Sequence, residues 1–296
     1  MVSYGLYSLV NKNSLRKAAA RRSQLSKTQN RKNMFQNTWY QIGRSIVNFY
    51  VRNILRANIV QEAPLPAGAK ILAVNHPSTN DPAFVTALLK EQASILIRET
   101  LFKVPVFGRS LRMAGHIPVV AGNGRAALEE GVRLLKAGRT IIIFPEGEIS
   151  PESGPLKPHT GIARLALLTG APVIPVGISL DHKQVRIVQT RVEGKLEPSA
   201  WYLHGPYAMT VGIPNVYEGD VEDRDRVRSV TNQVMSSIVA LSQKGQMRLA
   251  LAQRQAALRA ANAGKVARAA RWAAQSVVLR GIQAMLFLVI GAAGRV

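Results

Sequence analysis

Short apolar runs alternate with helical patterns through the middle of this chain, and this alternation constrains the fold more than any other feature. Six runs have the apolar, strand-like composition of buried strands: 71–74, 94–97, 117–120, 140–144, 173–178 and 185–188. Helical patterns lie between them at 83–90, 106–113, 125–136 and 162–168. Strands separated by helices of this length form mostly parallel sheets that are covered on both faces. We therefore expect an α/β domain with such a sheet, to which the run 208–213 would add an edge strand.

One of these strands leads directly into a polar turn with the residues for acid–base chemistry. His76 follows the run 71–74, Asp81 comes five positions later, and Pro82 begins a helical pattern. Open α/β sheets usually place their chemistry at the carboxyl ends of their strands. A carboxylate that accepts one ring N–H fixes the imidazole tautomer and leaves the other nitrogen free as a base. Taken alone, the pair is more simply explained by a histidine that satisfies the turn and an aspartate that caps a helix.

Three further motifs follow this turn in order. They are Phe-Pro-Glu-Gly at Phe144–Gly147, a lysine and a glycine at Lys157 and Gly161, and Val-Ile-Pro-Val at Val173–Val176. The turn itself supplies the first motif, with Asn75, His76, Ser78 and Asp81. Together the four motifs resemble the phospholipid/glycerol acyltransferase family, of the lysophosphatidate acyltransferase type, over about residues 70–180.

The resemblance implies an O-acyltransferase that moves a fatty acyl group from a thioester to a hydroxyl without an acyl-enzyme. His76 would be the catalytic base, and Asp81 would orient it. Substrate contacts are expected from Asn75, Ser78, Glu146, Gly147, Lys157 and Gly161. The favoured reaction converts 1-acylglycerol-3-phosphate to phosphatidate, and the alternative is acylation of another lysolipid or of glycerol-3-phosphate. Acyl-CoA or acyl-carrier protein would be the co-substrate, and no cofactor is expected.

One motif departs from the family pattern. The family's second block usually reads Gly-x-Ile-x-Val-x-Arg, and Gly115–Val120 fits it, but Ala121 stands where the arginine is expected. In the family, that arginine is thought to help hold the phosphate of the acceptor. Arg125 is close enough in sequence to replace it, or it is an ordinary residue in the first turn of a helix. The departure puts lysophosphatidate itself in question as the acceptor.

The charge of the chain is concentrated at its two ends. Residues 1–56 and 226–296 carry 11 Lys/Arg each and no Asp or Glu, which accounts for the whole formal net charge of +22. Basic ends of this kind bind polyanions, either an anionic lipid surface or nucleic acid. A basic nucleic-acid-binding protein is the alternative of another class. It leaves the four core motifs unexplained, so we expect no nucleic-acid partner.

The composition also limits the kinds of site that are possible. The chain has no cysteine, which excludes disulfides and thiolate metal sites. Its histidines outside the first motif show no metal-ligand spacing, and we interpret each as structural: His116, His159, His182 and His204. No metal site is therefore expected.

The N-terminal extension contains an apolar stripe at helical spacing. The stripe lies within residues 34–56 and consists of Phe35, Trp39, Ile42, Ile46 and Phe49. A helix with such a stripe lies in the plane of a membrane surface when arginines occupy its other faces. The stripe is equally compatible with packing on the protein core, and one helix can do both along its length.

The C-terminal extension is expected to be a basic helix from Arg224 to beyond Arg271. An apolar run at 282–294 follows, between Arg280 and Arg295. It is shorter than the ~20 residues that a spanning helix needs, so an interfacial anchor or hairpin is expected.

These features divide the chain into three parts. Residues 1–62 would form a basic tail and a membrane-docking helix, residues 63–222 the acyltransferase domain, and residues 223–296 the basic helix and apolar anchor. The N-terminus shows no secretory signal pattern. We expect a peripheral or monotopic protein on the cytoplasmic face of a membrane. Its partners would be an anionic lipid surface, a lysophospholipid and an acyl thioester, including acyl-carrier protein.

Overall fold

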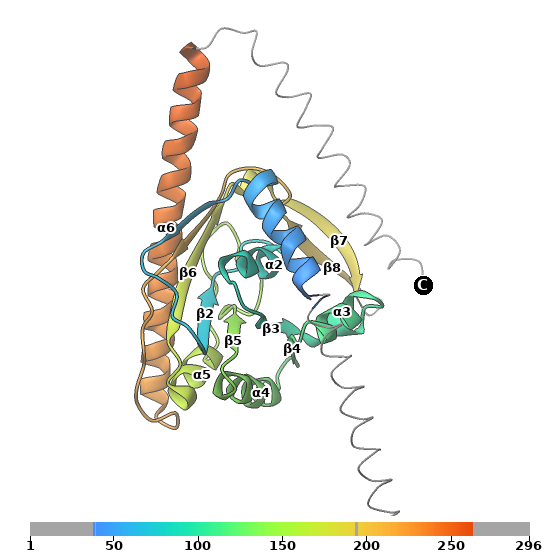
Figure 1. Cartoon of the computed structure of the whole chain (residues 1–296), viewed down its shortest axis with the longest axis vertical. Helices are drawn as coiled ribbons and strands as arrows, with labels where there is room; N and C mark the ends of the chain where they lie inside the picture. Colours follow the sequence, from blue (N-terminus) through green and yellow to red (C-terminus); the bar gives the residue numbers. More distant parts are fainter. Residues whose placement is uncertain (1–37, 39, 193–194, 263–296) are drawn as a thin grey trace, which may run out of the picture. The chain divides into compact units, whose positions relative to one another are not determined.

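The structure is a computed structural model that describes residue 38, residues 40–192 and residues 195–262 (Figure 1). It divides into a first unit, residues 1–45, and a second unit, residues 46–296. Residues 40–49 are helical, and the helix passes into a π-helical turn, η1 (Tyr50–Ile54). Phe35, Trp39 and the apolar run at 282–294 lie outside the described residues.

A seven-stranded sheet forms the centre of the second unit. Its strands lie in the order β1 (Asn58–Gln61), β9 (Tyr207–Val211), β6 (Val173–Leu180), β2 (Lys70–Val74), β5 (Thr140–Ile143), β3 (Ala93–Arg98) and β4 (Ile117–Val119). Neighbouring strands are parallel, except that β9 runs antiparallel to β6. The expected α/β fold with a mostly parallel sheet is therefore confirmed.

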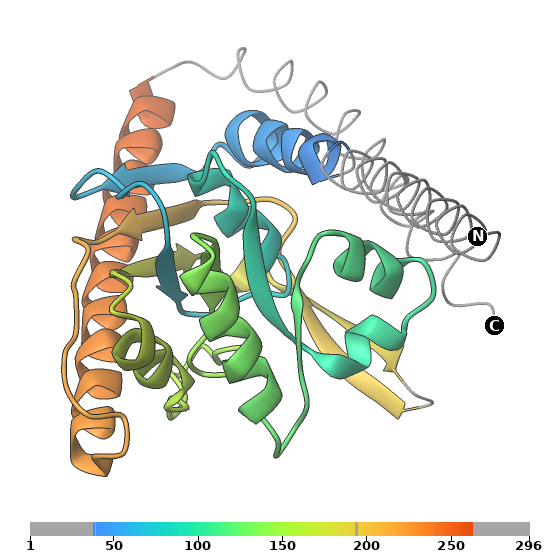
Figure 2. The same ribbon diagram turned by 60° about the horizontal axis from the view of Figure 1, so that its bottom comes forward.

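Helices cover both faces of this sheet, as the long apolar strands require. The helices and short helical turns are α2 (Asp81–Val85), η2 (Thr86–Leu88), η3 (Glu99–Lys103), α3 (Phe107–Met113), α4 (Arg125–Lys136), α5 (Gly161–Thr169), η4 (His182–Gln184) and α6 (Arg224–Asn262). Successive side chains of β2 point to opposite faces. α4, α5 and α6 lie on one face of the sheet (Figure 2). Ile71 and Ala73 pack with them in one core cluster, whereas Leu72 and Val74 pack with α2 and η1 in the other.

Two strand assignments differ from the sequence-based expectation. The run at 208–213 was expected at an edge, but β9 lies inside the sheet, because β1 pairs with its other side. The run at 185–188 does not join the sheet. It belongs to β7 (Arg186–Val192), which pairs with β8 (Lys195–Trp201) in a separate antiparallel hairpin. β1 and β8 lack a strand-like signal, since β1 is short and β8 contains Lys195, Glu197 and Pro198.

The second unit also incorporates elements that the sequence assigns to the ends. β1 lies before the expected boundary at 62, and α6 lies after the one at 222, yet β1 extends the sheet and α6 packs along β6. α6 runs in the direction of β2 and β6: Val227 and Val230 lie in the cluster with Ile71 and Val173, near the start of both strands. Its C-terminal half projects beyond the carboxyl ends of those strands (Figure 1).

Two glycines allow α6 to approach β6 closely. A Cβ atom on Gly177 would overlap the backbone of Leu241 and Ser242, and a Cβ on Gly245 of α6 would lie 2.6 Å from Ser179 Oγ. The Ser179 hydroxyl donates to the Ser242 carbonyl at 2.5 Å, which ties the strand to the helix. The contact is therefore a backbone-to-backbone approach that leaves no room for a side chain.

We predict that Gly177→Ala lowers the midpoint of thermal unfolding by several degrees. The added methyl forces α6 away from the sheet, and overpacking of this kind costs about 1–3 kcal/mol. The matched control is Gly124→Ala, because a Cβ there meets no atom within 4 Å and the backbone φ is −77°. Equal unfolding midpoints for the two variants would show that α6 does not need this close approach.

Candidate active site

His76 and Asp81 meet in the turn after β2, as their spacing predicts. His76 Nδ1 lies 3.2 Å from Asp81 Oδ2. Because an ionised carboxylate can only accept, this contact assigns the ring proton to Nδ1 and leaves Nε2 as the free acceptor. The Asp81 side chain is fully buried, whereas the His76 side chain retains 16% of its exposure. The imidazole thus reaches solvent while its carboxylate partner does not.

Asp81 accepts hydrogen bonds from three further donors. The Ser78 backbone N–H donates to Oδ2 at 2.6 Å, and the Ser78 hydroxyl donates to Oδ1 at 2.7 Å. The hydroxyl of Tyr207 donates to Oδ1 at 2.8 Å from β9. A buried carboxylate is costly unless donors replace its hydration, and these contacts supply them. Ser78 therefore orients Asp81 in this structure, whereas the sequence suggested a substrate contact.

The turn that carries His76 is tied to the Phe-Pro-Glu-Gly motif through Ser150. Ser150 N–H donates to the His76 carbonyl at 2.8 Å, and the His76 N–H donates to Ser150 Oγ at 3.2 Å. The Phe144 ring packs against the imidazole, with the ring centroids 4.5 Å apart. These contacts hold the imidazole between the ends of β2 and β5.

Glu146 occupies a different place from the one that its motif suggested. The sequence predicts a bond to an acceptor hydroxyl, but Glu146 is only 2% exposed. Its carboxylate accepts from the Ser150 hydroxyl at 2.7 Å and from the Leu156 N–H at 2.6 Å. Glu146 therefore fastens the loop that leads to Lys157, whose side chain is exposed.

Asn75 uses its side-chain amide to bond to the protein. Its amide nitrogen donates to the Ile178 carbonyl at 2.9 Å, and its amide oxygen accepts from the Ile178 N–H at 2.7 Å. This pair of bonds joins the end of β2 to β6 beyond their regular pairing. The other side of the turn is held by β8, since the Thr79 N–H donates to the Ala200 carbonyl at 2.7 Å.

The two predicted glycines, Gly147 and Gly161, lie near the two ends of the loop between β5 and α5. Gly147 has a φ of +73°, which glycine adopts without strain. A Cβ there would lie 3.0 Å from the His159 ring, so the turn also leaves little room for a side chain at this position. Gly161 is the first residue of α5. Both therefore shape the loop between β5 and α5.

Arg125 lies on the surface in the first turn of α4. Its side chain is 86% exposed, and its Nε donates to Glu129 Oε1 at 2.9 Å. Arg125, four residues after Ala121, is thus an exposed cation paired with Glu129, and a bound anion would have to displace that glutamate.

His116 has the structural role expected for it. Its Nδ1 accepts the Ile95 N–H at 3.2 Å, next to the start of β4. Burial, together with the charge of Arg139, lowers the pKa of His116 to about 4. The ring is therefore neutral near pH 7, as an acceptor for a backbone N–H requires. Within the described residues, no three His, Asp or Glu side chains form a metal-binding group.

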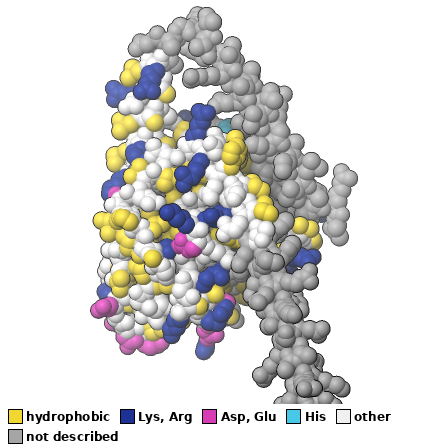
Figure 3. All heavy atoms as spheres, viewed as in Figure 1, with side chains coloured by type: hydrophobic (Ala, Val, Ile, Leu, Met, Phe, Trp, Pro, Cys, Tyr) yellow, Lys and Arg dark blue, Asp and Glu magenta, His cyan; other side chains and the backbone are white. Residues whose placement is uncertain are grey.

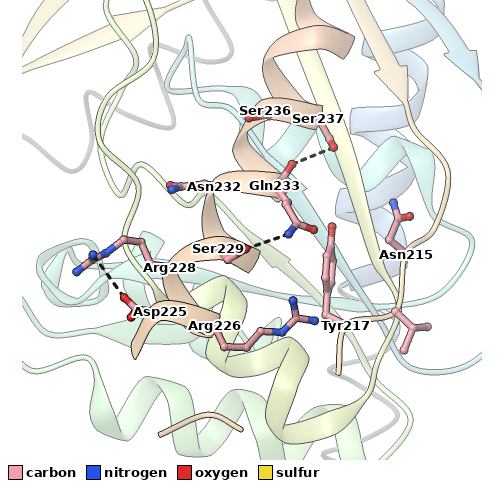
Figure 4. Close-up of a pocket in the computed structure, with 11 residues that line it drawn as sticks. Asn215, Tyr217, Asp225, Arg226, Arg228, Ser229, Asn232, Gln233, Ser236 and Ser237 are labelled. Atoms are coloured by element: carbon pink, nitrogen blue, oxygen red, sulfur yellow. Dashed lines mark hydrogen bonds and ion pairs between the residues drawn. The ribbon is translucent and has the colours of Figure 1, made fainter. Parts of the chain in front are cut away.

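A large groove of about 960 Å³ lies elsewhere, between α6 and the segment that leads to it (Figure 4). Its lining is mainly polar, and several of the side chains bond to one another, as Gln233 does to Ser229. The groove borders the first half of α6, next to the starting ends of β2 and β6. None of the predicted site residues lines it, so it is separate from the His76 turn.

Residues 56–179 match the family model described as Acyltransferase, and this span includes all the predicted site residues. Over this segment the chain is similar to an acyltransferase domain. A 1-acyl-sn-glycerol-3-phosphate acyltransferase of Pseudomonas aeruginosa is 30% identical over 116 residues, which make up 38% of this chain and 45% of that protein. The protein of the same name from Escherichia coli (strain K12) is 27% identical over 124 residues, 40% of this chain and 51% of that protein. The chain therefore spans about half the length of the curated relatives it matches.

A solved structure is also similar to this chain. The crystal structure of the 1-acyl-sn-glycerophosphate (LPA) acyltransferase PlsC from Thermotoga maritima covers 71% of this chain and 81% of that chain, with a TM-score of 0.48 and 20% identity.

Sequence reasoning missed two residues of the acyltransferase site. Ser150 links the His76 turn to the Phe-Pro-Glu-Gly motif. It follows Gly147 closely enough that a search for polar residues after that motif would include it. Tyr207 lies 126 positions from Asp81 and outside the matched span. No local spacing marks it, because only the pairing of β9 with β6 brings it to this turn.

Proposed function

We propose that the domain transfers a fatty acyl group from a thioester to the hydroxyl of a glycerol phospholipid precursor. The observation that carries this proposal is the His76–Asp81 contact. The His76 imidazole has Nδ1 bonded to a buried carboxylate, which leaves Nε2 for a substrate, at the carboxyl end of a parallel strand. The name shared by the curated relatives favours 1-acylglycerol-3-phosphate as the acceptor and phosphatidate as the product. Another lysolipid or glycerol-3-phosphate is the alternative.

The reaction needs a single proton-transfer group. As the acceptor oxygen attacks the thioester carbonyl carbon, His76 Nε2 takes the hydroxyl proton. The resulting imidazolium is stabilised by the Asp81 carboxylate at Nδ1. When the tetrahedral intermediate collapses, the C–S bond breaks and His76 returns the proton to the departing thiolate. The donor is acyl-CoA or acyl-carrier protein, and no acyl-enzyme forms.

Cations that follow strand ends at the same edge of the sheet would hold the acceptor head group. Lys157 is exposed on the loop that Glu146 fastens, and Arg125 is exposed at the start of α4, which follows β4. Both lie after carboxyl ends of parallel strands, as His76 does. A phosphate would gain a charge-assisted hydrogen bond from either side chain.

We further propose that the protein docks on the cytoplasmic face of an anionic membrane with the His76 side toward the lipid. Ile46 and Phe49 are 63% and 59% exposed on the helix that leads into η1, so this part of the stripe does not pack on the core. Tyr50, the next residue, stacks on Phe84 of α2, the helix that begins at Asp81. Basic and hydrophobic side chains occur together on the projecting half of α6 (Figure 3). Acidic side chains gather at the opposite end, where Glu218–Asp225 leads into α6. No helix among the described residues is long and apolar enough to cross a bilayer.

We predict that His76→Ala lowers kcat by about 10²- to 10⁴-fold, because the base is lost. Asp81→Asn should also be severely impaired, since the amide removes the charge and can reverse the tautomer. Turnover is measured with glycerol-3-phosphate, lysophosphatidate and other lysophospholipids, each with acyl-CoA and acyl-carrier protein. Near-normal turnover in folded His76→Ala, or no turnover of any pair by the unmodified protein, would contradict the proposal.

We predict that Arg125→Ala raises the KM of the acceptor by about 10-fold and leaves the KM of the donor unchanged, because one charge-assisted bond to phosphate is lost. Arg133→Ala is the matched control. Arg133 is also exposed on α4 and paired with a glutamate, Glu130. If both KM values stay unchanged in Arg125→Ala, Arg125 does not replace the arginine missing at Ala121.

We predict that Ile46→Ser/Phe49→Ser weakens flotation of the full chain with anionic liposomes, since inserted apolar side chains resist the screening that releases charged ones at high salt. The control is Ile213→Ser/Val216→Ser, in which the altered side chains are similarly exposed, at 57% and 60%, but lie at the acidic end. Equal flotation of the two variants would reject this face as the membrane contact. Truncation to residues 57–225 is unsuitable, because it removes α6 from the sheet.

A further inference from the structure

The two oxygens of Asp81 have different donors. Oδ2 bonds to His76 Nδ1 and to the Ser78 N–H, and Oδ1 bonds to the hydroxyls of Ser78 and Tyr207. His76 and Ser78 belong to the same turn as Asp81, so their bonds move with it. Among the hydrogen bonds described for this carboxylate, the one from Tyr207 comes from a separate strand. That bond therefore relates the carboxylate to the sheet.

Tyr207 is held as firmly as any residue of the core. It is 1% exposed, and as the first residue of β9 it pairs with Leu180 of β6. Its ring meets Phe84 of α2 edge-on with the centroids 5.5 Å apart, and it meets Tyr202 at 5.7 Å. Three different segments thus fix the direction in which its hydroxyl points.

The hydroxyl also stays protonated near neutral pH, so it remains a hydrogen-bond donor. Burial and the neighbouring charge of Asp81 raise the pKa of Tyr207 well above 10. A phenylalanine would fill the same space and make the same ring contacts. The hydroxyl is therefore what distinguishes Tyr207 from a phenylalanine. Burial of an unpaired hydroxyl would be costly, and Asp81 Oδ1 is the acceptor that satisfies it.

We infer that Tyr207 is a positioning residue that acts on His76 through Asp81. Its bond to Oδ1 holds the carboxylate so that Oδ2 faces Nδ1, which keeps the proton on Nδ1 and the lone pair on Nε2. The inference that Tyr207 orients His76 rests on the structure alone. Its predicted effect on turnover rests on the proposed function.

The first test is spectroscopic and does not depend on any activity. The ring ¹⁵N chemical shifts of His76, assigned by comparison with His76→Ala, report the populations of the two tautomers. The full chain should show the Nδ1-protonated tautomer, and Tyr207→Phe should shift both ring nitrogens toward the values of a tautomer mixture. Unchanged ring shifts in folded Tyr207→Phe would overturn the inference.

The chain offers a closely matched control in Tyr202→Phe. Tyr202 is also buried and contacts the Tyr207 ring, but its hydroxyl donates to the Pro206 carbonyl at 2.6 Å. Its loss should leave the His76 shifts as they are. If both variants shift His76 equally, the effect is one of packing, and the inference fails. Should Tyr207→Phe not fold, 4-fluorophenylalanine at position 207 fills the hydroxyl volume without donating, and the same readings apply.

Kinetics then measure the consequence for the proposed reaction. Tyr207→Phe should lower kcat by about 10-fold, as expected for one lost hydrogen bond, with both KM values within about twofold of the starting values. A rise in KM with kcat unchanged would overturn the positioning role, because it would mean that Tyr207 acts on substrate binding. If the unmodified protein transfers no acyl group while the spectroscopic result holds, the proposed function fails and the geometric inference stands.

Discussion

The Asp81 carboxylate has no exposed surface, so every hydrogen bond that it made to water had to be replaced by a protein donor. The replacements come from its own turn, from the imidazole and from β9. This requirement explains why the surroundings of a two-residue site involve so much of the fold. The strand order, the antiparallel placement of β9 and the packing of Phe84 together place the Tyr207 hydroxyl against Asp81 Oδ1.

The neighbouring motifs are rigid for a related reason. Ser150, Glu146 and Asn75 use their polar atoms on the backbone or on one another. The bonds of Asn75 and Ser150 join the turn after β2 to β6 and to the loop after β5, and those of Glu146 hold that loop together. A catalytic group has to be held to within a fraction of an ångström, and side chains locked by such supporting bonds achieve this. In the described part of the chain, exposed groups such as Lys157 make no such bond and stay available to a substrate under the proposed function.

The sequence predicted much of this architecture, and its failures have identifiable causes. The central strands and helices were recoverable because local apolar periodicity marks them, and α4 was found with its observed limits, Arg125–Lys136. β1 was missed because its side chains are mostly exposed, and β9 was placed at the edge because no local pattern tells which strands will flank another. The same limit applies to the site. His76 and Asp81 share a motif, whereas Tyr207 joins them only through tertiary structure.

The close contact between α6 and β6 has a consequence for biosynthesis. β9 is held between β1 and β6, and α6 covers β6 through Gly177 and Gly245. A ribosome has therefore to release the chain through Gly245 before the strand that carries Tyr207 is fully enclosed. Contacts this distant in sequence form late in folding, because their loop-closure entropy is large. A nascent chain would contain the His76 turn and the Phe-Pro-Glu-Gly motif long before its imidazole was correctly oriented, so the orientation of His76 would report that synthesis and folding had passed that point.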